Sequence, residues 1–346
     1  MSAKRSISFS KREVKRCCKL KKTNFAVMGA GYWGKKVVFE YSQLAKENSD
    51  VNLSAVCDLS KENLQFCNEN YSIPYLCSSL EEILSSPEID AVNICTPSET
   101  HFKISKAALE AGKHVLVEKP MSLTSREAYE LYDLAKAKGL VISVGHIYRF
   151  NNALKKVRDL IKDGYFGDIY YLKLQWTTLC PSPEGRDIIT DLAPHPFDII
   201  NYLLHDWPSK LSCKAKTYRR KELEEVAYCI AEFDNGVMAH IELSWLLPGK
   251  IREVKVMGSK RCAKIDCLRQ VIEAVENGDF YDIPVKMNNT IKDELEHFIA
   301  CIGNGKSGNP KCTNRNGGLI GANVVRLLET ARRAIETERT ESVEVR

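Results

Sequence analysis

The sequence predicts an α/β protein of two domains: a doubly wound parallel sheet, followed by an α+β domain with a large mixed or antiparallel sheet. Its 346 residues exceed the size of about 250 residues at which single hydrophobic cores stop growing. In the first part, short apolar runs alternate with helix-like stretches, the pattern of buried parallel strands joined by helices. In the second part, apolar runs follow one another with turn residues between them, which is typical of an antiparallel or mixed sheet.

The first domain is expected to cover residues 23–148. Continuous apolar runs predict its strands, because parallel strands are buried on both faces of their sheet. These strands are expected at 25–28, 53–57, 91–94, 114–117 and 141–144. The helices between them are expected at 33–45, 61–70, 101–111 and 125–138.

The second domain is expected to cover residues 149–346. A helix through Asp163 precedes strands that are expected at 169–176, 227–233, 237–244 and 251–257. Asn235 and Gly236 stand between two of these apolar runs and predict a tight hairpin. Two late helices are expected at 293–301 and 320–337, and the last one is expected to return to the first domain.

The composition is that of a soluble globular protein, with 44% hydrophobic and 27% charged residues. No run of about 18 apolar residues is present to span a bilayer. The 13 cysteines are odd in number and no secretory signal precedes them, so we expect reduced thiols in a cytoplasmic protein. Cys262 and Cys267 lie close together, but without a histidine or a second cysteine pair they do not predict a metal site.

The positive net charge of +5 comes from the first residues of the chain. Residues 1–22 contain nine Lys or Arg against one Glu, a net charge of +8, which leaves −3 for the remainder. This segment has no apolar stretch and is expected to be a disordered, solvated arm. Contact with nucleic acid or with a membrane is not expected.

Three glycines follow the first strand in the spacing G-x-G-x-x-G, at Gly29, Gly31 and Gly34. The first glycine allows a tight turn, the second lets the backbone approach a pyrophosphate, and the third lets helix pack on strand. Asp58 ends the second strand, where a carboxylate accepts hydrogen bonds from ribose hydroxyls; alternatively, it only caps the next helix. The pattern predicts a Rossmann domain that binds NAD, with NADP as the alternative.

Two further segments end strands at the carboxyl edge of the sheet, where ligands bind in such folds. Thr96 and Pro97 follow the strand at 91–94 and are expected to line the cofactor. His101 is either another cofactor contact or only the first residue of a helix. Lys119 follows Glu118 at the end of the strand at 114–117 and is expected to point into the same crevice, beside a proline that fixes the backbone.

Asp191 and His195 are the candidate polar pair of the second domain. Proline is tolerated only in the first turn of a helix, so the segment Ala193-Pro194-His195-Pro196 predicts a helix that begins near Ala193. His195 then lies in the first turn and Asp191 just before it. The spacing does not prove that the two side chains meet, and such a pair is often only structural. Arg149 is a candidate for an anionic substrate group, because a guanidinium matches phosphate or carboxylate.

These motifs together resemble the glucose-fructose oxidoreductase, inositol 2-dehydrogenase and rhizopine-catabolism family (GFO/IDH/MocA). The resemblance runs from about residue 24 to residue 337 and includes the glycines, the Thr96 loop and the Glu118-Lys119-Pro120 segment. It also includes Asp191-x-x-x-His195, within which Ala193 stands where many members have glycine. The resemblance implies that Lys119 and His195 are catalytic and that Asp191 is the third member of the group.

The resemblance also implies the reaction. It is a hydride transfer between NAD(P) and a secondary alcohol of a sugar, with Tyr32, Trp33 and Glu118 beside the cofactor. Residues 145–151 and 187–198 are most similar to members that act on nucleotide-activated amino sugars, which implies Arg149 and Asn151 as substrate contacts. The expected substrate is the 3-hydroxyl of such a sugar or of its uronate. A free-polyol or inositol dehydrogenase and a non-catalytic NAD(P)-binding sensor are the alternatives.

The reaction needs a base within reach of the hydroxyl that loses its proton. His195 can be that base, with Lys119 as a cation on the same oxygen and Asp191 orienting the pair. The reverse assignment, with Lys119 as base and His195 as orienter, stays open because coupled groups share their titration. One uncovered face of the second sheet predicts a homodimer or a homotetramer.

Overall fold

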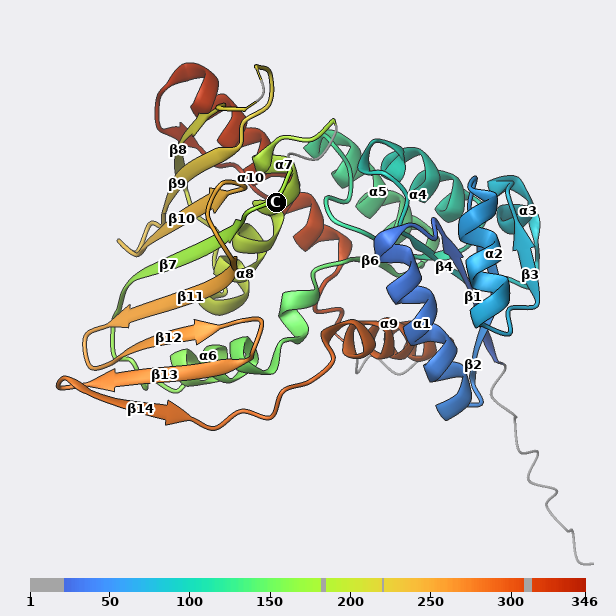
Figure 1. The fold of residues 1–346 in the computed structure, drawn as a ribbon, viewed down its shortest axis with the longest axis horizontal. Coiled ribbons are helices and arrows are strands. Elements are labelled where there is room, and N and C mark those ends of the chain that lie inside the picture. Colours follow the sequence, from blue (N-terminus) through green and yellow to red (C-terminus); the bar gives the residue numbers. More distant parts are fainter. Residues whose placement is uncertain (1–21, 182–184, 220, 308–312) are drawn as a thin grey trace, which may run out of the picture.

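The computed structural model describes residues 22–181, 185–219, 221–307 and 313–346, with the side chains of 304–307 left aside. The chain folds into two lobes, each built on its own sheet (Figure 1). All but the last residue of the basic arm predicted at 1–22 lie outside the described residues. The predicted α/β class with two sheets is confirmed. Within the described residues, none of the helices has the length and apolar composition needed to cross a bilayer.

The N-terminal lobe contains a six-stranded sheet in the order β3-β2-β1-β4-β5-β6. All neighbouring strands are parallel, which confirms the doubly wound sheet. Its strands are β1 (Thr23–Met28), β2 (Val51–Cys57), β3 (Tyr75–Cys77), β4 (Ala91–Ile94), β5 (His114–Val117) and β6 (Ile142–Val144). The strand order reverses between β1 and β4, and this reversal opens a crevice at the carboxyl ends of the two strands.

Helices cover both faces of this sheet, and most residues of β1, β4, β5 and β6 are therefore buried. They are α1 (Tyr32–Glu47), α2 (Lys61–Asn70), α3 (Leu80–Ser85), α4 (His101–Glu110), α5 (Ser125–Lys138) and the 3₁₀ turn η1 (Ser98–Thr100). Side-chain caps set some of the starts: Ser60 accepts from the amide of Asn63 at α2, and Thr124 accepts from that of Glu127 at α5. β3 and α3 were not predicted from the sequence; β3 has three residues, of which only Cys77 is buried.

The C-terminal lobe contains a nine-stranded mixed sheet in the order β14-β13-β12-β11-β7-β10-β9-β8-β15. β7 pairs with β10 in parallel and with β11 antiparallel. The strands are β7 (Ile169–Thr178), β8 (Lys210–Lys216), β9 (Val226–Glu232), β10 (Met238–Ser244), β11 (Lys250–Gly258), β12 (Cys262–Asp266), β13 (Val271–Glu276), β14 (Asp279–Ile283) and β15 (Glu341–Ser342). β9 and β10 form the hairpin predicted at Asn235-Gly236, and Gly236 has a φ of +84°.

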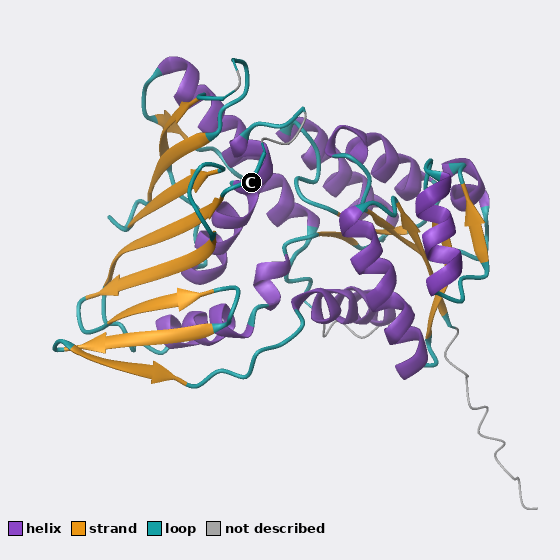
Figure 2. Cartoon of the chain, viewed as in Figure 1, coloured by secondary structure: helices purple, strands orange, loops and turns teal. Residues whose placement is uncertain are grey.

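The second lobe and its junction with the first contain further helices and a 3₁₀ turn. They are η2 (Ile147–Phe150), α6 (Asn152–Lys162), α7 (Ile188–Leu192), α8 (Pro194–Leu204), α9 (Thr290–Ser307) and α10 (Gly318–Thr337). α6 and α8 pack with strands of the large sheet into one core, in which Phe197 and Trp176 are fully buried. Figure 2 shows the strands of this lobe as one continuous, twisted sheet.

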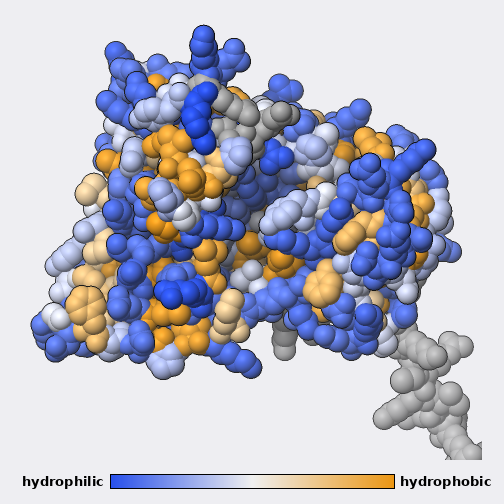
Figure 3. All heavy atoms as spheres, viewed as in Figure 1, coloured by the Kyte–Doolittle hydropathy of each residue, from blue (hydrophilic) through white to orange (hydrophobic). Residues whose placement is uncertain are grey.

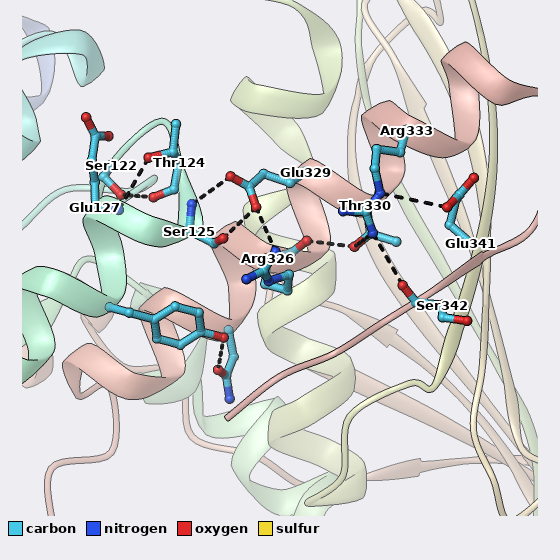
Figure 4. A network of polar contacts seen from close by, with 12 residues as sticks. Ser122, Thr124, Ser125, Glu127, Arg326, Glu329, Thr330, Arg333, Glu341 and Ser342 are labelled. Carbon is cyan, nitrogen blue, oxygen red and sulfur yellow. Dashed lines mark hydrogen bonds and ion pairs between the residues drawn. The ribbon is translucent and has the colours of Figure 1, made fainter.

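α10 holds the two lobes together. It packs against α5 and β6 of the first lobe and against β8 and α8 of the second. The carboxylate of Glu329 accepts hydrogen bonds from the backbone amide of Ser125, at 2.8 Å, and from its hydroxyl, at 2.5 Å (Figure 4). Nearby, the hydroxyl of Tyr129 donates to the amide oxygen of Asn323. This helix therefore contacts both lobes and fixes their relative position in the structure.

Candidate active site

The loop from β1 to α1 has the shape of a phosphate-binding turn. Gly29 has a φ of +89°, and a Cβ there would lie 2.8 Å from the backbone of Cys95. A Cβ on Gly34 would lie 1.9 Å from the carbonyl oxygen of Gly29, so no side chain fits there. A Cβ on Gly31 would meet nothing within 4 Å, which leaves space for a ligand. α1 begins without a side-chain cap or an acidic first turn, so its amides are available to a pyrophosphate.

Asp58 lies directly beside this loop. Its Oδ2 accepts a hydrogen bond of 2.5 Å from the amide of Ala30, and its Oδ1 accepts one of 2.7 Å from the amide of Ser60. The carboxylate thus joins the end of β2 to the glycine turn and to the start of α2. These contacts support the reading in which Asp58 braces the start of α2, and its role as an acceptor for a ribose stays a prediction.

The segment after β4 forms the next wall of the crevice. The hydroxyl of Thr100 donates to Thr96 Oγ1 at 2.7 Å. Pro97 precedes η1 and is exposed. His101 is 1% exposed, and its ring nitrogens lie 2.7 Å from the carbonyl oxygen of Pro120 and 2.8 Å from that of Thr96. Its polar atoms are therefore used to join two loops of the crevice.

Glu118 has an environment that favours its neutral form. Burial raises the pKa of Glu118 to about 7, against the opposing effects of the Lys119 charge and of a hydrogen bond from Trp33 Nε1. A Cβ at Gly145 would lie 2.7 Å from the Glu118 carboxylate. The close approach of the Glu118 side chain therefore explains why position 145 is a glycine.

Lys119 connects the two domains at the crevice. Its Nζ donates to the carbonyl oxygen of Asp191 at 2.7 Å and lies 3.5 Å from Oδ1 of the same residue. Lys119 comes from the end of β5 and Asp191 from α7, 72 residues further along the chain. The two side chains are 18% and 21% exposed, so both remain open to a ligand.

His195 lies in the first turn of α8 and faces the same space. Burial, and then the positive charges of Lys119 and Arg252, lower the pKa of His195 well below its ordinary value. Its ring packs edge-on against Tyr148, with 5.1 Å between ring centres. His195 is therefore neutral at neutral pH and able to accept a proton.

A pocket of about 390 Å³ lies between the lobes, and its lining does not include Gly29, Gly31, Gly34, Asp58 or Pro97. Figure 3 shows the surface hollowed at this junction. Of the residues expected at the site, the pocket wall includes Tyr32, Trp33, Thr96, His101, Glu118, Lys119, Asp191 and His195. A larger hollow of about 950 Å³ lies away from these residues, beside α5 and the C-terminal residues.

The structure does not bring Arg149 and Asn151 to this pocket. Arg149 is 5% exposed, and its Nε donates to Asp198 Oδ1 at 2.6 Å. Its Nη2 donates to the side chain of Asn201 at 2.7 Å. Asn151 caps α6 by accepting from the amides of Ala153 and Leu154. Their hydrogen bonds are used within the second lobe, which favours structural roles over the expected substrate contact.

Other residues occupy the place expected for Arg149. Tyr148, Arg186, Lys250 and Arg252 line the pocket. Tyr148 stands next to Arg149 in the segment that the sequence had singled out. Lys250 and Arg252 come from β11, where no local pattern in the sequence indicates contact with a site in the first lobe.

The fold and the site define an oxidoreductase with an NAD-binding domain and a second domain that completes the site. Residues 23–146 match the oxidoreductase family with an NAD-binding Rossmann fold, and residues 154–264 match the GFO/IDH/MocA C-terminal domain. The chain belongs to the GFO/IDH/MocA family, as the sequence motifs predicted, and is an NAD-dependent dehydrogenase.

Relatives cover nearly the whole chain. The uncharacterised oxidoreductase YrbE of Bacillus subtilis is 27% identical over 84% of this chain and 89% of its own. Myo-inositol 2-dehydrogenase of Thermotoga maritima is 24% identical over 88% of this chain and 95% of its own. UDP-N-acetylglucosamine 3-dehydrogenase GnnA of Acidithiobacillus ferrooxidans superposes with a TM-score of 0.79 at 24% identity, covering 91% and 98% of the two chains. That structural likeness shows a shared fold.

The position of Asp58 predicts a preference for NAD over NADP. A 2′-phosphate would be repelled by this carboxylate, whereas a free 2′-hydroxyl can donate to it. Asp58→Asn, which keeps an oxygen acceptor for Ala30, should shift the ratio of kcat/KM values toward NADP by about tenfold, the scale of one charge repulsion near a surface. Initial rates at equal, subsaturating coenzyme concentrations measure this ratio. A wild-type protein that is faster with NADP would contradict the role of Asp58.

Proposed function

We propose that the protein oxidises a secondary alcohol of a sugar or polyol, with Lys119, Asp191 and His195 around the reacting hydroxyl. The observation that carries the proposal is the contact of Lys119 with Asp191 across the domain boundary, with His195 lining the same pocket. Each domain alone holds only part of this group. The pocket is therefore complete only where the two lobes meet.

The bound NAD supplies the acceptor for the hydride. Gly29, Gly31 and Gly34 would hold its pyrophosphate at the start of α1, and Asp58 would hold the adenosine ribose. Six further residues would complete the cofactor side of the crevice: Tyr32, Trp33, Thr96, Pro97, His101 and Glu118.

The side chains of this pocket divide the work on the hydroxyl. His195 accepts the proton, because its lowered pKa keeps the ring neutral at neutral pH. Lys119 donates a hydrogen bond to the same oxygen and stabilises the negative charge that develops there. Asp191 positions Lys119 through two contacts with its Nζ, one from the backbone carbonyl oxygen of Asp191 and one from its carboxylate. We favour this assignment over the reverse one on the basis of the His195 environment.

The pH dependence of oxidation follows from this assignment. Since the pKa of His195 lies well below 6.5, kcat/KM should stay level from neutral to mildly alkaline pH and fall in acid, as the base becomes protonated. Glu118, with a pKa of about 7, also titrates nearby, and Glu118→Gln separates its contribution. An acid limb above pH 6.5 that persists in Glu118→Gln would contradict His195 as the base.

The substrate we propose is the 3-hydroxyl of a nucleotide-linked amino sugar or its uronate, oxidised to a ketone. Similarity to a protein named UDP-N-acetylglucosamine 3-dehydrogenase supports it, together with the segments around residues 145–151 and 187–198. Similarity to a protein named myo-inositol 2-dehydrogenase supports the second candidate, a free polyol. Both are tested by incubating the purified protein with NAD and each of UDP-N-acetylglucosamine, its uronate, free N-acetylglucosamine and myo-inositol.

The absorbance of reduced cofactor reports the result. Turnover with a UDP sugar and none with the free compounds supports the first candidate. Turnover with myo-inositol alone moves the function to the second candidate. A protein that binds NAD but reduces none with any compound would support the non-catalytic sensor.

We also propose a homodimer or homotetramer formed through the open face of the large sheet. Along β9, Tyr228 and Ile230 are exposed while Ala227 and Cys229 are buried, so one face of the strand presents apolar side chains to the outside. Met238 of β10, Tyr171 of β7 and Phe280 of β14 lie on the same face of the sheet and are exposed as well. Apolar surfaces of this kind mark subunit contacts. Light scattering of the purified protein gives the number of subunits.

A further inference from the structure

The pocket between the lobes carries more positive than negative side chains. Its wall contains the cations Lys119, Arg186, Lys250 and Arg252 and the carboxylates Glu118 and Asp191. Asp191 lies against Lys119, and Glu118 is partly protonated at neutral pH because burial raises its pKa to about 7. The cations from β11 are therefore left without an equal negative charge in the pocket.

Arg252 is a buried cation in the middle of this wall. It is 8% exposed, and its Nη1 donates to the carbonyl oxygens of Thr177, at 2.9 Å, and Ile251, at 2.7 Å. Within the described part of the chain, no carboxylate lies at ion-pair distance from it. Burying a guanidinium without a paired charge is costly, and neutral carbonyls only partly offset that cost. An anion that entered the pocket would supply the missing charge.

Lys250 lies two residues before Arg252 on β11. Alternate residues of a strand share a face, and the buried positions of β11 are Arg252, Val254 and Val256. Lys250 is on this same side but at the exposed end of the strand, where it lines the pocket mouth. It too has no ion-pair partner among the residues that the structure describes. The two cations thus lie on the same face of β11, with Lys250 exposed and Arg252 buried, and both line the pocket.

This pair is linked to the catalytic group by one side chain. Tyr148 lies close enough to Arg252 for the positive charge of the guanidinium to oppose the effect of burial, which raises the pKa of the Tyr148 hydroxyl. The ring of the same tyrosine packs edge-on against the ring of His195. A group held by Arg252 therefore lies one side chain away from the base, a separation that a single sugar derivative can span.

We propose that Lys250 and Arg252 form an anion subsite for a phosphate or carboxylate group of the substrate. The inference rests on the proposed function, because it assumes that the rest of the anionic molecule is a sugar with its hydroxyl at His195. It assigns to β11 the charge recognition that the sequence had suggested for Arg149. The substrate class is then an anionic sugar derivative rather than a neutral polyol.

Equilibrium binding tests the subsite without turnover. The full-length protein, saturated with NAD so that the glycine loop is filled, is titrated calorimetrically with UDP and uridine, and with glucuronate and glucose. At least one anion should bind about tenfold or more tightly than its neutral match, the scale of a charged hydrogen bond. UDP identifies a phosphate subsite and glucuronate a carboxylate subsite.

Three variants make the test specific. Lys250→Gln should weaken binding of the preferred anion by about tenfold, and this exposed position should leave the fold intact. Arg252→Lys keeps the charge but loses the fork of donors, and should also weaken binding. Lys255→Gln removes the same charge from the opposite face of β11 and should bind as the wild type does.

The subsite is overturned if neither anion binds better than its neutral match, or if Lys250→Gln and Arg252→Lys bind like the wild type. An equal loss of affinity for the anion in Lys255→Gln would also overturn the subsite, because the loss would then come from the overall charge of the protein. Failure of the proposed function gives a different result. In that case the anion still binds through Lys250, but no sugar derivative reduces the cofactor.

Discussion

Replacing Lys119 or His195 by alanine should lower turnover on the best sugar substrate by about 10²-fold or more, the usual scale for lost acid–base catalysis. Lys119→Ala removes the cation that lies against Asp191 and that would stabilise charge on the substrate oxygen. His195→Ala removes the neutral ring that accepts the proton. Steady-state rates of cofactor reduction at saturating substrate measure both effects.

The affinity for NAD distinguishes a loss of catalysis from a general defect in folding. His195 is in the second domain, so His195→Ala should change the dissociation constant of NAD little. His205→Asn, which replaces an exposed histidine with a left-handed φ at the end of α8, outside the pocket wall, is the control and should keep wild-type turnover. Near-normal turnover in His195→Ala would overturn the catalytic assignment.

Arg149→Ala should reduce the free energy of unfolding by about 3–5 kcal/mol, the usual cost of breaking a buried ion pair. Asp198 is 1% exposed, and its Oδ1 accepts from Arg149 at 2.6 Å. Without the guanidinium, a buried carboxylate is left with no opposite charge. Urea unfolding followed by tryptophan fluorescence gives the difference in free energy.

An exposed ion pair provides the comparison for Arg149. Arg269 is 77% exposed and pairs with Asp266 at 2.7 Å, so Arg269→Ala should cost less than about 1 kcal/mol. The Michaelis constant of folded Arg149→Ala distinguishes the two roles of this residue. A large rise in that constant with unchanged stability would restore the substrate contact that the sequence suggested.

Much of the first lobe could be predicted because its strands are buried on both faces. Apolar runs without alternation, such as those of β4 and β5, differ clearly from the helices around them. β3 was missed because three residues are too few to show a periodic pattern. In the second lobe β14 reads Asp-Phe-Tyr-Asp-Ile, which lacks the strict alternation of apolar and polar residues that marks a half-buried strand.

The site could be predicted in part for a topological reason. Gly29, Thr96 and Lys119 each follow a strand of one parallel sheet, and the carboxyl ends of such strands meet at one edge. Asp191 and His195 came from a helix start that two prolines mark. The charges could not be assigned in this way, because the sequence does not show that Arg149 pairs with Asp198, 49 residues away.

The contribution of β11 is missing from the sequence analysis for the same reason. Lys250 and Arg252 reach the pocket only through the packing of two lobes, and their local sequence is that of an ordinary strand with polar residues. Pairing between β11 and β7 sets their position. A cation that can bind a ligand and a cation that is already paired have the same side chain. Only the folded structure shows which carboxylates lie beside each of them.

We propose that this chain moves a hydride from a sugar carbon to NAD. The most direct measurement uses the best substrate of the panel with deuterium at the carbon that carries the reacting hydroxyl. After reaction and denaturation, mass spectrometry of the reduced cofactor should show a molecule heavier by a single deuterium, and His195→Ala should form it far more slowly. Reduced cofactor without the label, or no reduced cofactor with any sugar, would contradict the account.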